Sequence, residues 1–306
     1  MLNTNRTGKY LELAIPEPWD GIKIAEIFKE KWGVPKKLAH QFRMEGKVLL
    51  KGERADWEMR LLAGTKIHLL LFDDMPPQVQ PFYMDLGILY EDNHLLIANK
   101  PPFISTHPNS PDDNETLVNA VSAHLQTSGD GGSVQQIHRL DRDTTGAIIF
   151  AKHPLAGAIL DRMLEERAIK RTYIAGVMGT GLRKKGTINE PIGRDRHHAT
   201  RRRVSKTGQE AVTHYRVLKA DHEKGMTWVS CWLETGRTHQ IRVHFSHIGH
   251  PLAGDLLYGG KPIFNRQALH SAKIEFKHPI TLEEIVVHAA FQDNPPIFEG
   301  IDVDKI

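Results

Sequence analysis

The sequence predicts an α+β fold in two parts, and three observations support this prediction. The first 72 residues combine helical segments with short strands, whereas strands dominate from Phe82 onward. A proline-rich stretch without hydrophobic periodicity, Asp73–Pro81, separates the two parts. The 306 residues are enough for two domains and a sizeable core. We therefore expect a small domain over residues 1–75, a linker over 76–83 and a larger domain over 84–306.

The small domain is predicted to contain two helices followed by strands. Apolar residues at helical spacing indicate a first helix that ends near Lys31. Pro35 suits the first turn of a second helix, and Gly46 is placed to end it. Short apolar runs then predict strands at Val48–Leu50 and Lys66–Phe72.

The distribution of charge predicts a polyanionic partner. The formal net charge is only +3, but nine Lys/Arg oppose four glutamates between Gly21 and Arg54. Six Lys/Arg oppose one acid between Arg194 and Lys206. Two basic patches on a nearly balanced chain suggest a polyanion bound at two places, although either patch could instead be a solvated face. The candidate contacts are Lys36, Lys37 and Arg43 in the first patch and Arg201, Arg202 and Arg203 in the second.

Composition excludes several classes of protein. No stretch approaches the roughly 20 consecutive apolar residues of a membrane span, and the N-terminus lacks the hydrophobic core of a signal peptide. Cys231 is the only cysteine, so a disulfide framework and a multi-cysteine zinc site are both excluded. We expect a soluble cytoplasmic protein.

The larger part is predicted to consist mainly of strands with a few helices. Apolar residues at helical spacing predict helices at Thr116–Leu125 and around Leu155, Ile159 and Met163. Alternation and apolar runs predict strands at Ile88–Tyr90, Leu95–Ala98, Arg171–Met178, Ala211–Leu218 and Met226–Leu233.

The most informative stretch is QQIHRLDRDTTGAIIFAK, residues 135–152. Its apolar end, Ala147–Ala151, predicts a buried strand, and Thr144–Gly146 predicts a turn before it, with glycine where positive φ or close approach is needed. Five ionisable residues precede this turn within six positions: His138, Arg139, Asp141, Arg142 and Asp143.

Asp141 is the candidate catalytic group in this cluster. It lies between two arginines in sequence, and a nearby guanidinium would lower the pKa of its carboxyl by roughly 1–3 units. An ionised carboxylate on a rigid strand edge suits a nucleophile or general base. The alternative interpretation is an Asx-turn with surface ion pairs.

A second informative stretch, Glu234–Gly254, predicts a helix. Ile241, Phe245 and Ile248 have the spacing of one buried face, Thr238 is a plausible N-cap, and Gly249 with Pro251 ends the helix. Arg237 and His239 stand at its start, where free N–H groups favour an anion such as phosphate.

Histidines in the same stretch suggest a metal site as an alternative. His244 and His247 could share a helix face, but a metal site needs a third convergent ligand. Phosphate-facing and helix-surface histidines are the simpler interpretation. The set comprises His239, His244, His247 and His250.

Four motifs in order resemble the RluA-like pseudouridine synthases. HRLDRDTTG followed by AIIFAK resembles the signature H-R-L-D-x-x-T-S-G, with Thr145 where serine is usual. YEDNHLLIANKPPFISTHP resembles the opening strand pair and N-K-P turn of the family, with Pro102–Phe103 replacing a small residue plus glycine. KRTYIAGVMG and TGRTHQIRVHFSHIGHPLAGDLLYG resemble the later strand and the helix with its loop. The N-terminal string LAHQFRMEGKVLLKGERADWEMRLLAGTKIHL resembles an αL-type RNA-binding domain, an arrangement found in this family.

The resemblance implies a fold and an activity. It implies a catalytic domain built on a bent, mixed, mainly antiparallel sheet, and isomerisation of specific uridines in structured RNA without a metal or organic cofactor. Asp141 would attack the flipped uridine or its sugar, Tyr173 would lie against the base to handle the proton at carbon 5, and Arg242 would pair with Asp141. The implied RNA contacts near the flipped nucleotide are Arg139, Arg237 and His239.

Other functions remain open at this point. A non-catalytic RNA-binding or ribosome-assembly factor could keep the fold, but the presence of Asp141, Tyr173 and Arg242 favours the enzyme. A metal-dependent hydrolase that uses the histidines comes third. Large-subunit ribosomal RNA is the favoured target and transfer RNA the alternative. The expected enzyme is a monomer.

Overall fold

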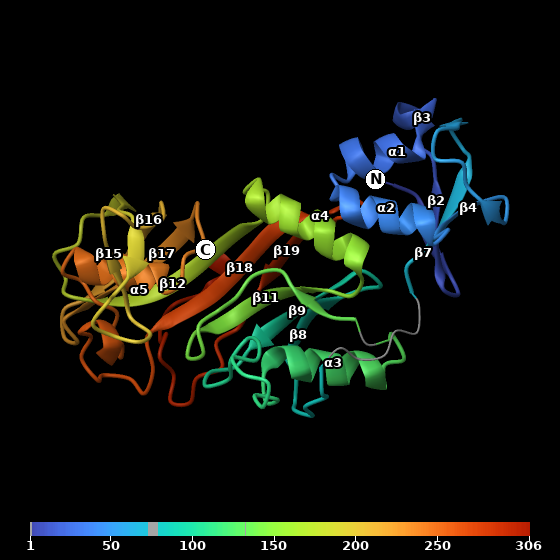
Figure 1. Ribbon diagram of the computed structural model, residues 1–306. Helices are drawn as coiled ribbons and strands as arrows, with labels where there is room; N and C mark the ends of the chain where they lie inside the picture. Colours follow the sequence, from blue (N-terminus) through green and yellow to red (C-terminus); the bar gives the residue numbers. More distant parts are fainter. Residues whose placement is uncertain (1, 73–78, 132) are drawn as a thin grey trace.

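A computed structural model describes residues 2–72, 79–131 and 133–306, and it contains two large sheets (Figure 1). The smaller sheet and its helices come from the N-terminal residues and lie at one end of the molecule. The larger sheet runs through the rest of the chain.

The smaller sheet is antiparallel, in the order β1-β2-β7-β4-β5. Its strands are β1 (Thr4–Thr7), β2 (Tyr10–Ala14), β4 (Val48–Leu50), β5 (Glu53–Arg54) and β7 (Lys66–Leu70). A separate pair joins β3 (Ile22–Lys23) to β6 (Arg60–Leu61). The helices are η1 (Glu17–Trp19), α1 (Ile24–Glu26), its π-helical continuation η2 (Ile27–Lys31), and α2 (Lys36–Met44).

The two helices predicted for this region are confirmed, with small differences at their ends. The first ends at Lys31, as predicted, but its second half is a π-helix. Pro35 is the N-cap of α2 and therefore lies one residue before the helix. Gly46 adopts a φ of 64°, which fits its predicted role in ending α2. Sequence reasoning missed β1 and β2. The polar β1 shows no apolar alternation, whereas β2 buries Leu11 and Leu13 in alternation, a signal that could have found it.

The larger sheet has the order β13-β16-β17-β12-β18-β11-β9-β8, with β19 beside β18 and β10 beside β11. All its pairings are antiparallel except the parallel pair β11–β18, which confirms the predicted α+β class and mixed, mainly antiparallel sheet. Its strands are β8 (Ile88–Glu91), β9 (Leu95–Lys100), β10 (Gln135–Gln136), β11 (Thr145–Ala151), β12 (Lys170–Met178), β13 (Lys185–Asn189), β16 (Val212–Asp221), β17 (Met226–Leu233), β18 (Leu269–Lys277) and β19 (Glu284–His288).

The remaining elements of this part lie outside the larger sheet. A short hairpin pairs β14 (Ile192–Arg194) with β15 (Arg202–Val204). The helices are α3 (Leu117–Thr127), α4 (Pro154–Glu165), α5 (Gln240–His247), η3 (Leu256–Tyr258) and η4 (Val303–Lys305). No helix in the ranges that the structure describes has the length and apolar character needed to cross a membrane.

Helix α4 joins the two parts of the molecule (Figure 1). Leu155 and Ile159 on this helix pack into the same apolar cluster as the core of the smaller sheet. At a second contact, Arg6 of β1 donates hydrogen bonds of 2.9 Å to Asn93 and Asp130. Residues 73–78, which include the start of the predicted linker 76–83, lie outside the described ranges, and residues 79–87 form no helix or strand.

Candidate active site

Asp141 lies in the loop that leads into β11, and buried side chains fix this loop. Three of its carbonyl oxygens accept hydrogen bonds from such side chains. The pairs are Thr106 Oγ1 to Leu140 at 2.9 Å, Lys100 Nζ to Arg142 at 2.8 Å and Arg266 Nη1 to Asp143 at 3.1 Å. Burial lowers the pKa of Lys100 to about 7. Because buried donors hold successive parts of the loop, the Asp141 backbone has little freedom to move.

Gly146 allows β11 to approach β18. Its φ is 107°, and a Cβ at this position would collide with the backbone of Ser271, its parallel partner. Both predicted reasons for glycine therefore apply. The predicted turn is displaced, however: the chain turns at Arg142–Asp143, and Thr145 already belongs to the strand.

Arg242 on α5 forms an ion pair with Asp141, the pairing that the resemblance implied. Arg242 Nη1 donates to Asp141 Oδ2 at 2.9 Å, and the Arg242 side chain is 8% exposed. The guanidinium beside Asp141 thus comes from a helix 101 residues away and not from the neighbouring arginines in the sequence. Arg142 is instead exposed and lies 3.7 Å from Asp143.

Asp255 holds the opposite side of the same guanidinium. Its two carboxylate oxygens accept from Arg242 Nε at 2.7 Å and from Nη2 at 2.9 Å, and its side chain is 1% exposed. These two carboxylates raise the pKa of Arg242 above its ordinary value against the opposing effect of burial. Sequence reasoning did not assign Asp255, although it lies in the quoted loop after the helix.

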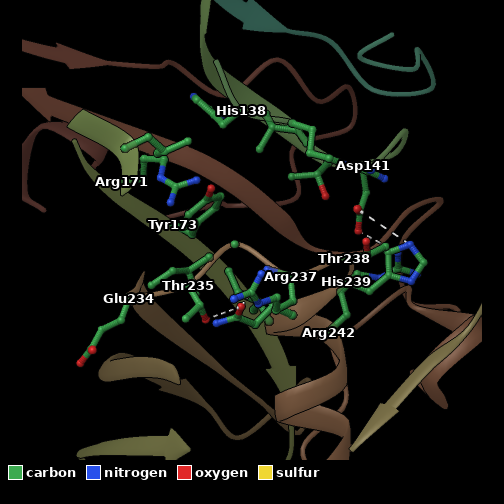
Figure 2. Close-up of a pocket in the computed structure, with 18 of the residues that line it drawn as sticks. His138, Asp141, Arg171, Tyr173, Glu234, Thr235, Arg237, Thr238, His239 and Arg242 are labelled. Carbon is green, nitrogen blue, oxygen red and sulfur yellow. Dashed lines mark hydrogen bonds and ion pairs between the residues drawn. The ribbon is translucent and has the colours of Figure 1, made fainter. Parts of the chain in front are cut away.

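His239 precedes α5 and lies near the other carboxylate oxygen of Asp141 (Figure 2). Its Nε2 is 3.9 Å from Asp141 Oδ1, and its Nδ1 is 2.8 Å from the Tyr258 hydroxyl. Burial lowers the pKa of His239, and the Arg242 guanidinium acts in the same direction.

The predicted details of α5 need two corrections. His239, with a φ of 59°, is the N-cap and not Thr238, and its side chain makes no capping hydrogen bond. The Gln240 side chain accepts from the Arg237 N–H at 3.0 Å instead. Ile248 is 37% exposed and not buried, since α5 ends at His247.

The side chains around Asp141 line a pocket of about 610 Å³, within the range of ligand sites (Figure 2). The structure brings six predicted residues to this pocket: Asp141, Tyr173, Arg242, Arg139, Arg237 and His239. Tyr173 is buried on β12, where the pairing with β18 shifts register between Thr172 and Tyr173.

Arg171 is a pocket residue that sequence reasoning missed. It precedes Tyr173 by two positions on β12 and lines the same pocket (Figure 2). No hydrogen bond or ion pair joins its side chain to another residue within the ranges described above. Strand periodicity could have found it, because positions i and i+2 share a face.

The other candidate cations lie outside the pocket. Lys36, Lys37 and Arg43 are exposed on α2, at the far end of the molecule from α5 (Figure 1). In the hairpin β14–β15, Arg203 is exposed, whereas Arg201 pairs with Asp195 at 2.6 Å. The backbone N–H of Arg202 donates to the Tyr258 hydroxyl.

The histidines of this region do not converge. His244 is buried and hydrogen-bonded to Thr213 and to the Glu190 carbonyl, whereas His250 contacts the Met178 carbonyl. Over residues 2–72, 79–131 and 133–306, no group of three or more His, Cys, Asp or Glu side chains has the arrangement of a metal site. The metal alternative thus lacks a ligand set there, and metal independence of the reaction stays a prediction.

Comparison with known proteins identifies the class to which this fold and pocket belong. The RNA pseudouridylate synthase family matches residues 94–247, and the N-terminal domain of RluD ribosomal pseudouridine synthase matches residues 11–67. The chain is 46% identical over 288 residues to the uncharacterized RNA pseudouridine synthase YhcT of Bacillus subtilis, covering 94% of this chain and 95% of that protein. It is 35% identical over 289 residues to ribosomal large subunit pseudouridine synthase D of Vibrio cholerae, covering 89% and 87%.

A solved structure agrees with this assignment. The fold resembles that of human RNA pseudouridylate synthase domain containing 1, with a TM-score of 0.57 and 25% identity over 68% of this chain and 84% of that chain. The chain belongs to the RNA pseudouridine synthases, a family of isomerases. Within that family, its two matched domains are those of the RluA-like enzymes with an RluD-type N-terminal domain.

Proposed function

We propose that this enzyme converts specific uridines of large-subunit ribosomal RNA to pseudouridine, with Asp141 as the catalytic group. The observation that carries the proposal is the Asp141–Arg242 ion pair of 2.9 Å at the pocket. The similarity to ribosomal large subunit pseudouridine synthase D of Vibrio cholerae supports the choice of RNA. Transfer RNA is the alternative target.

The chemistry follows from the two sides of the Asp141 carboxylate. Arg242 occupies Oδ2, which stabilises the ionised form and orients the group. Within the described ranges Oδ1 accepts no hydrogen bond, and His239 Nε2 lies 3.9 Å from it, so Oδ1 would be available to attack the uridine or its sugar. Tyr173 lies in the same pocket and would pack against the base and handle the proton at carbon 5.

Access to the pocket requires base flipping. A base stacked in an RNA helix cannot reach a carboxylate that is only 17% exposed, so the uridine must leave the stack. Cations at the pocket would hold the flipped nucleotide by its phosphates: Arg139, Arg171 and Arg237, with His239 as a neutral donor.

The wider basic surfaces would provide affinity. We assign residues 1–75 to an RNA-binding domain, 76–83 to a linker and 84–306 to the catalytic domain. In the first domain, Lys36, Lys37 and Arg43 would contact phosphates, and in the second the arginines 201–203 would do so. The proposed enzyme acts as a monomer in the cytoplasm, without a metal or organic cofactor.

A non-catalytic RNA-binding factor is the competing proposal. It leaves unexplained why two buried or half-buried carboxylates and a buried arginine are assembled around the pocket, since such an arrangement costs desolvation.

The experiment that tests the proposal is a map of pseudouridines in total RNA from cells with the gene, without it, and with only the Asp141→Asn variant. We expect one or a few large-subunit ribosomal positions to lose the modification in the last two strains. Loss at a transfer RNA position would correct the target, and an unchanged map would overturn the proposal.

A further inference from the structure

Tyr258 packs against Arg242 and His239, and no role was predicted for it. It ends η3, three residues after Asp255, and is 8% exposed. The Arg242 guanidinium lies 5.0 Å from the centre of its ring. The His239 ring meets it edge to face at 5.7 Å. Tyr258 thus contacts both residues that flank the Asp141 carboxylate.

The Tyr258 hydroxyl takes part in two hydrogen bonds, and the donor of each can be assigned. The backbone N–H of Arg202 donates to it at 2.9 Å, and His239 Nδ1 lies 2.8 Å away. Burial raises the pKa of Tyr258 to about 12, so the hydroxyl keeps its proton at neutral pH. All three polar groups are satisfied when Tyr258 donates this proton to His239 Nδ1.

This assignment fixes the tautomer of His239. With Nδ1 accepting, the single proton of the neutral imidazole is on Nε2. His239 Nε2 lies 3.9 Å from Asp141 Oδ1. This distance is too long for a hydrogen bond and leaves space for an RNA oxygen to approach both groups. The donor therefore lies beside the carboxylate oxygen that Arg242 leaves free.

Tyr258 also contacts the basic hairpin β14–β15. Besides the hydrogen bond from Arg202, Val204 of the hairpin packs with Tyr258 and with Val243 of α5 in one apolar cluster. Arg203, between Arg202 and Val204, remains exposed. The same side chain therefore contacts the hairpin and the catalytic pair.

We propose that Tyr258 is a positioning residue: it holds His239 as an Nε2–H donor toward the nucleotide beside Asp141 and anchors the basic hairpin that approaches the same RNA. The proposal rests on the proposed function for its RNA ligand. Its geometric part, the tautomer of His239, does not depend on the identity of that RNA.

Tyr258→Phe tests the proposal, because it removes the hydroxyl and keeps the ring against Arg242. Nitrogen NMR of the imidazole should show only the Nε2–H tautomer in the parent protein and a mixture of tautomers in the variant. With total RNA from cells lacking the gene as substrate, we expect kcat to fall about tenfold, the effect of losing about 1.4 kcal/mol at the transition state.

A double-mutant cycle separates positioning from packing. If Tyr258 acts through His239, Tyr258→Phe should lower kcat much less in a His239→Ala background than in the parent. Tyr215→Phe is the matched control, since Tyr215 is also buried and its hydroxyl has no hydrogen-bond partner within the described ranges. This control should leave both the His239 tautomer and kcat unchanged.

Two results would overturn the proposal. One is a parent protein whose His239 carries its proton on Nδ1. The other is a Tyr258→Phe effect of equal size with and without His239. If the parent made no pseudouridine at all, the proposed function would fail, whereas the NMR result would still decide the geometric part.

Discussion

Asp255 binds Arg242 through two parallel hydrogen bonds and leaves one guanidinium nitrogen, Nη1, for Asp141. The two-point contact fixes the plane of the guanidinium, which a single contact would not do. Arg242 therefore reaches Asp141 in one orientation, and the position of the proposed nucleophile depends on a buried acid that does not line the pocket.

We expect Asp255→Ala to destabilise the protein and to lower its activity severely. Removing one partner of a buried ion pair typically costs about 3–5 kcal/mol, because the remaining charge stays buried. Chemical denaturation measures the loss, and single-turnover assays measure the activity. Asp130→Ala is a control for stability, since Asp130 pairs with the buried Lys152 at 2.6 Å outside the pocket. Full activity of a folded Asp255→Ala variant would show that Arg242 does not need this support.

Asp141→Asn should abolish pseudouridine formation without loss of RNA binding. The amide keeps the shape of the side chain, but it can act neither as a nucleophile nor as a base. Filter binding and a pseudouridine assay on the same RNA measure the two properties. Turnover by a correctly folded Asp141→Asn protein would remove Asp141 from its proposed role.

Apolar periodicity and local motifs predicted the longer helices and part of the strands, but β13, β18 and β19 of the larger sheet were not predicted. Thr145–Ala151 and Met226–Leu233 are buried strands where apolar runs predicted them. Periodicity could not predict that Arg242 pairs with Asp141, since this pairing depends on how α5 docks beside the β11 loop. The resemblance to a family supplied it instead.

Other features had no signal that local reasoning could use. Asp255 meets Arg242 because the chain reverses after α5, and a lone acid in a loop has no periodic pattern. Thr238 matched the preferences of an N-cap, but the Gln240 side chain takes the N–H of Arg237 and leaves His239 at the cap. Gln240 is itself held by Val212 and Thr213 of β16, and tertiary contacts of this kind override the local preferences of short polar residues.

Treating the enzyme with EDTA should leave its activity intact. The histidines near α5 contact separate partners, and the chemistry proposed for Asp141 requires no Lewis acid. The chelator should be removed before the assay so that Mg²⁺ remains available to fold the RNA. If activity fell and returned only on addition of zinc, the metal-dependent alternative would replace this mechanism.

Acid should destabilise the protein through His94, whose ring lies 5.8 Å from the ring of Phe72. Burial lowers the pKa of His94 to about 4 from 6.5, with His278, Lys152 and Arg6 acting in the same direction and Asp92 opposing them. His94 also lies 2.9 Å from buried His153. Because the unfolded chain binds the proton more readily, the free energy of unfolding should fall as the pH drops from 6.5 toward 4.

Denaturation at several pH values checks this expectation against two variants. The pH dependence in this range should be smaller in His94→Gln than in the parent. His40→Gln, which changes an exposed histidine on α2, should behave like the parent. Identical pH dependence in His94→Gln and the parent would show that other groups control acid stability.

The basic face of α2 should contribute affinity and not catalysis. Lys36, Lys37 and Arg43 are exposed on α2, which lies far from the pocket (Figure 1). Each phosphate contact to irregular RNA contributes about −0.7 to the slope of log affinity against log salt. Replacing all three residues with alanine should therefore weaken binding and flatten the slope by up to about 2, while kcat at saturating RNA stays unchanged. Removing the whole N-terminal part would be a poorer test, since it would expose Leu155 and Ile159 of α4.

A matched triple variant separates this effect from the loss of net charge. Lys219, Lys224 and Lys305 are exposed and lie outside both α2 and the pocket, so their replacement with alanine removes the same charge elsewhere. That control should keep most of the salt slope, because contacts with individual phosphates and not net charge determine it. If the α2 variant bound RNA with the affinity and slope of the parent, the α2 face would be a solvated surface. The proposed RNA contacts would then be confined to the pocket and the hairpin β14–β15.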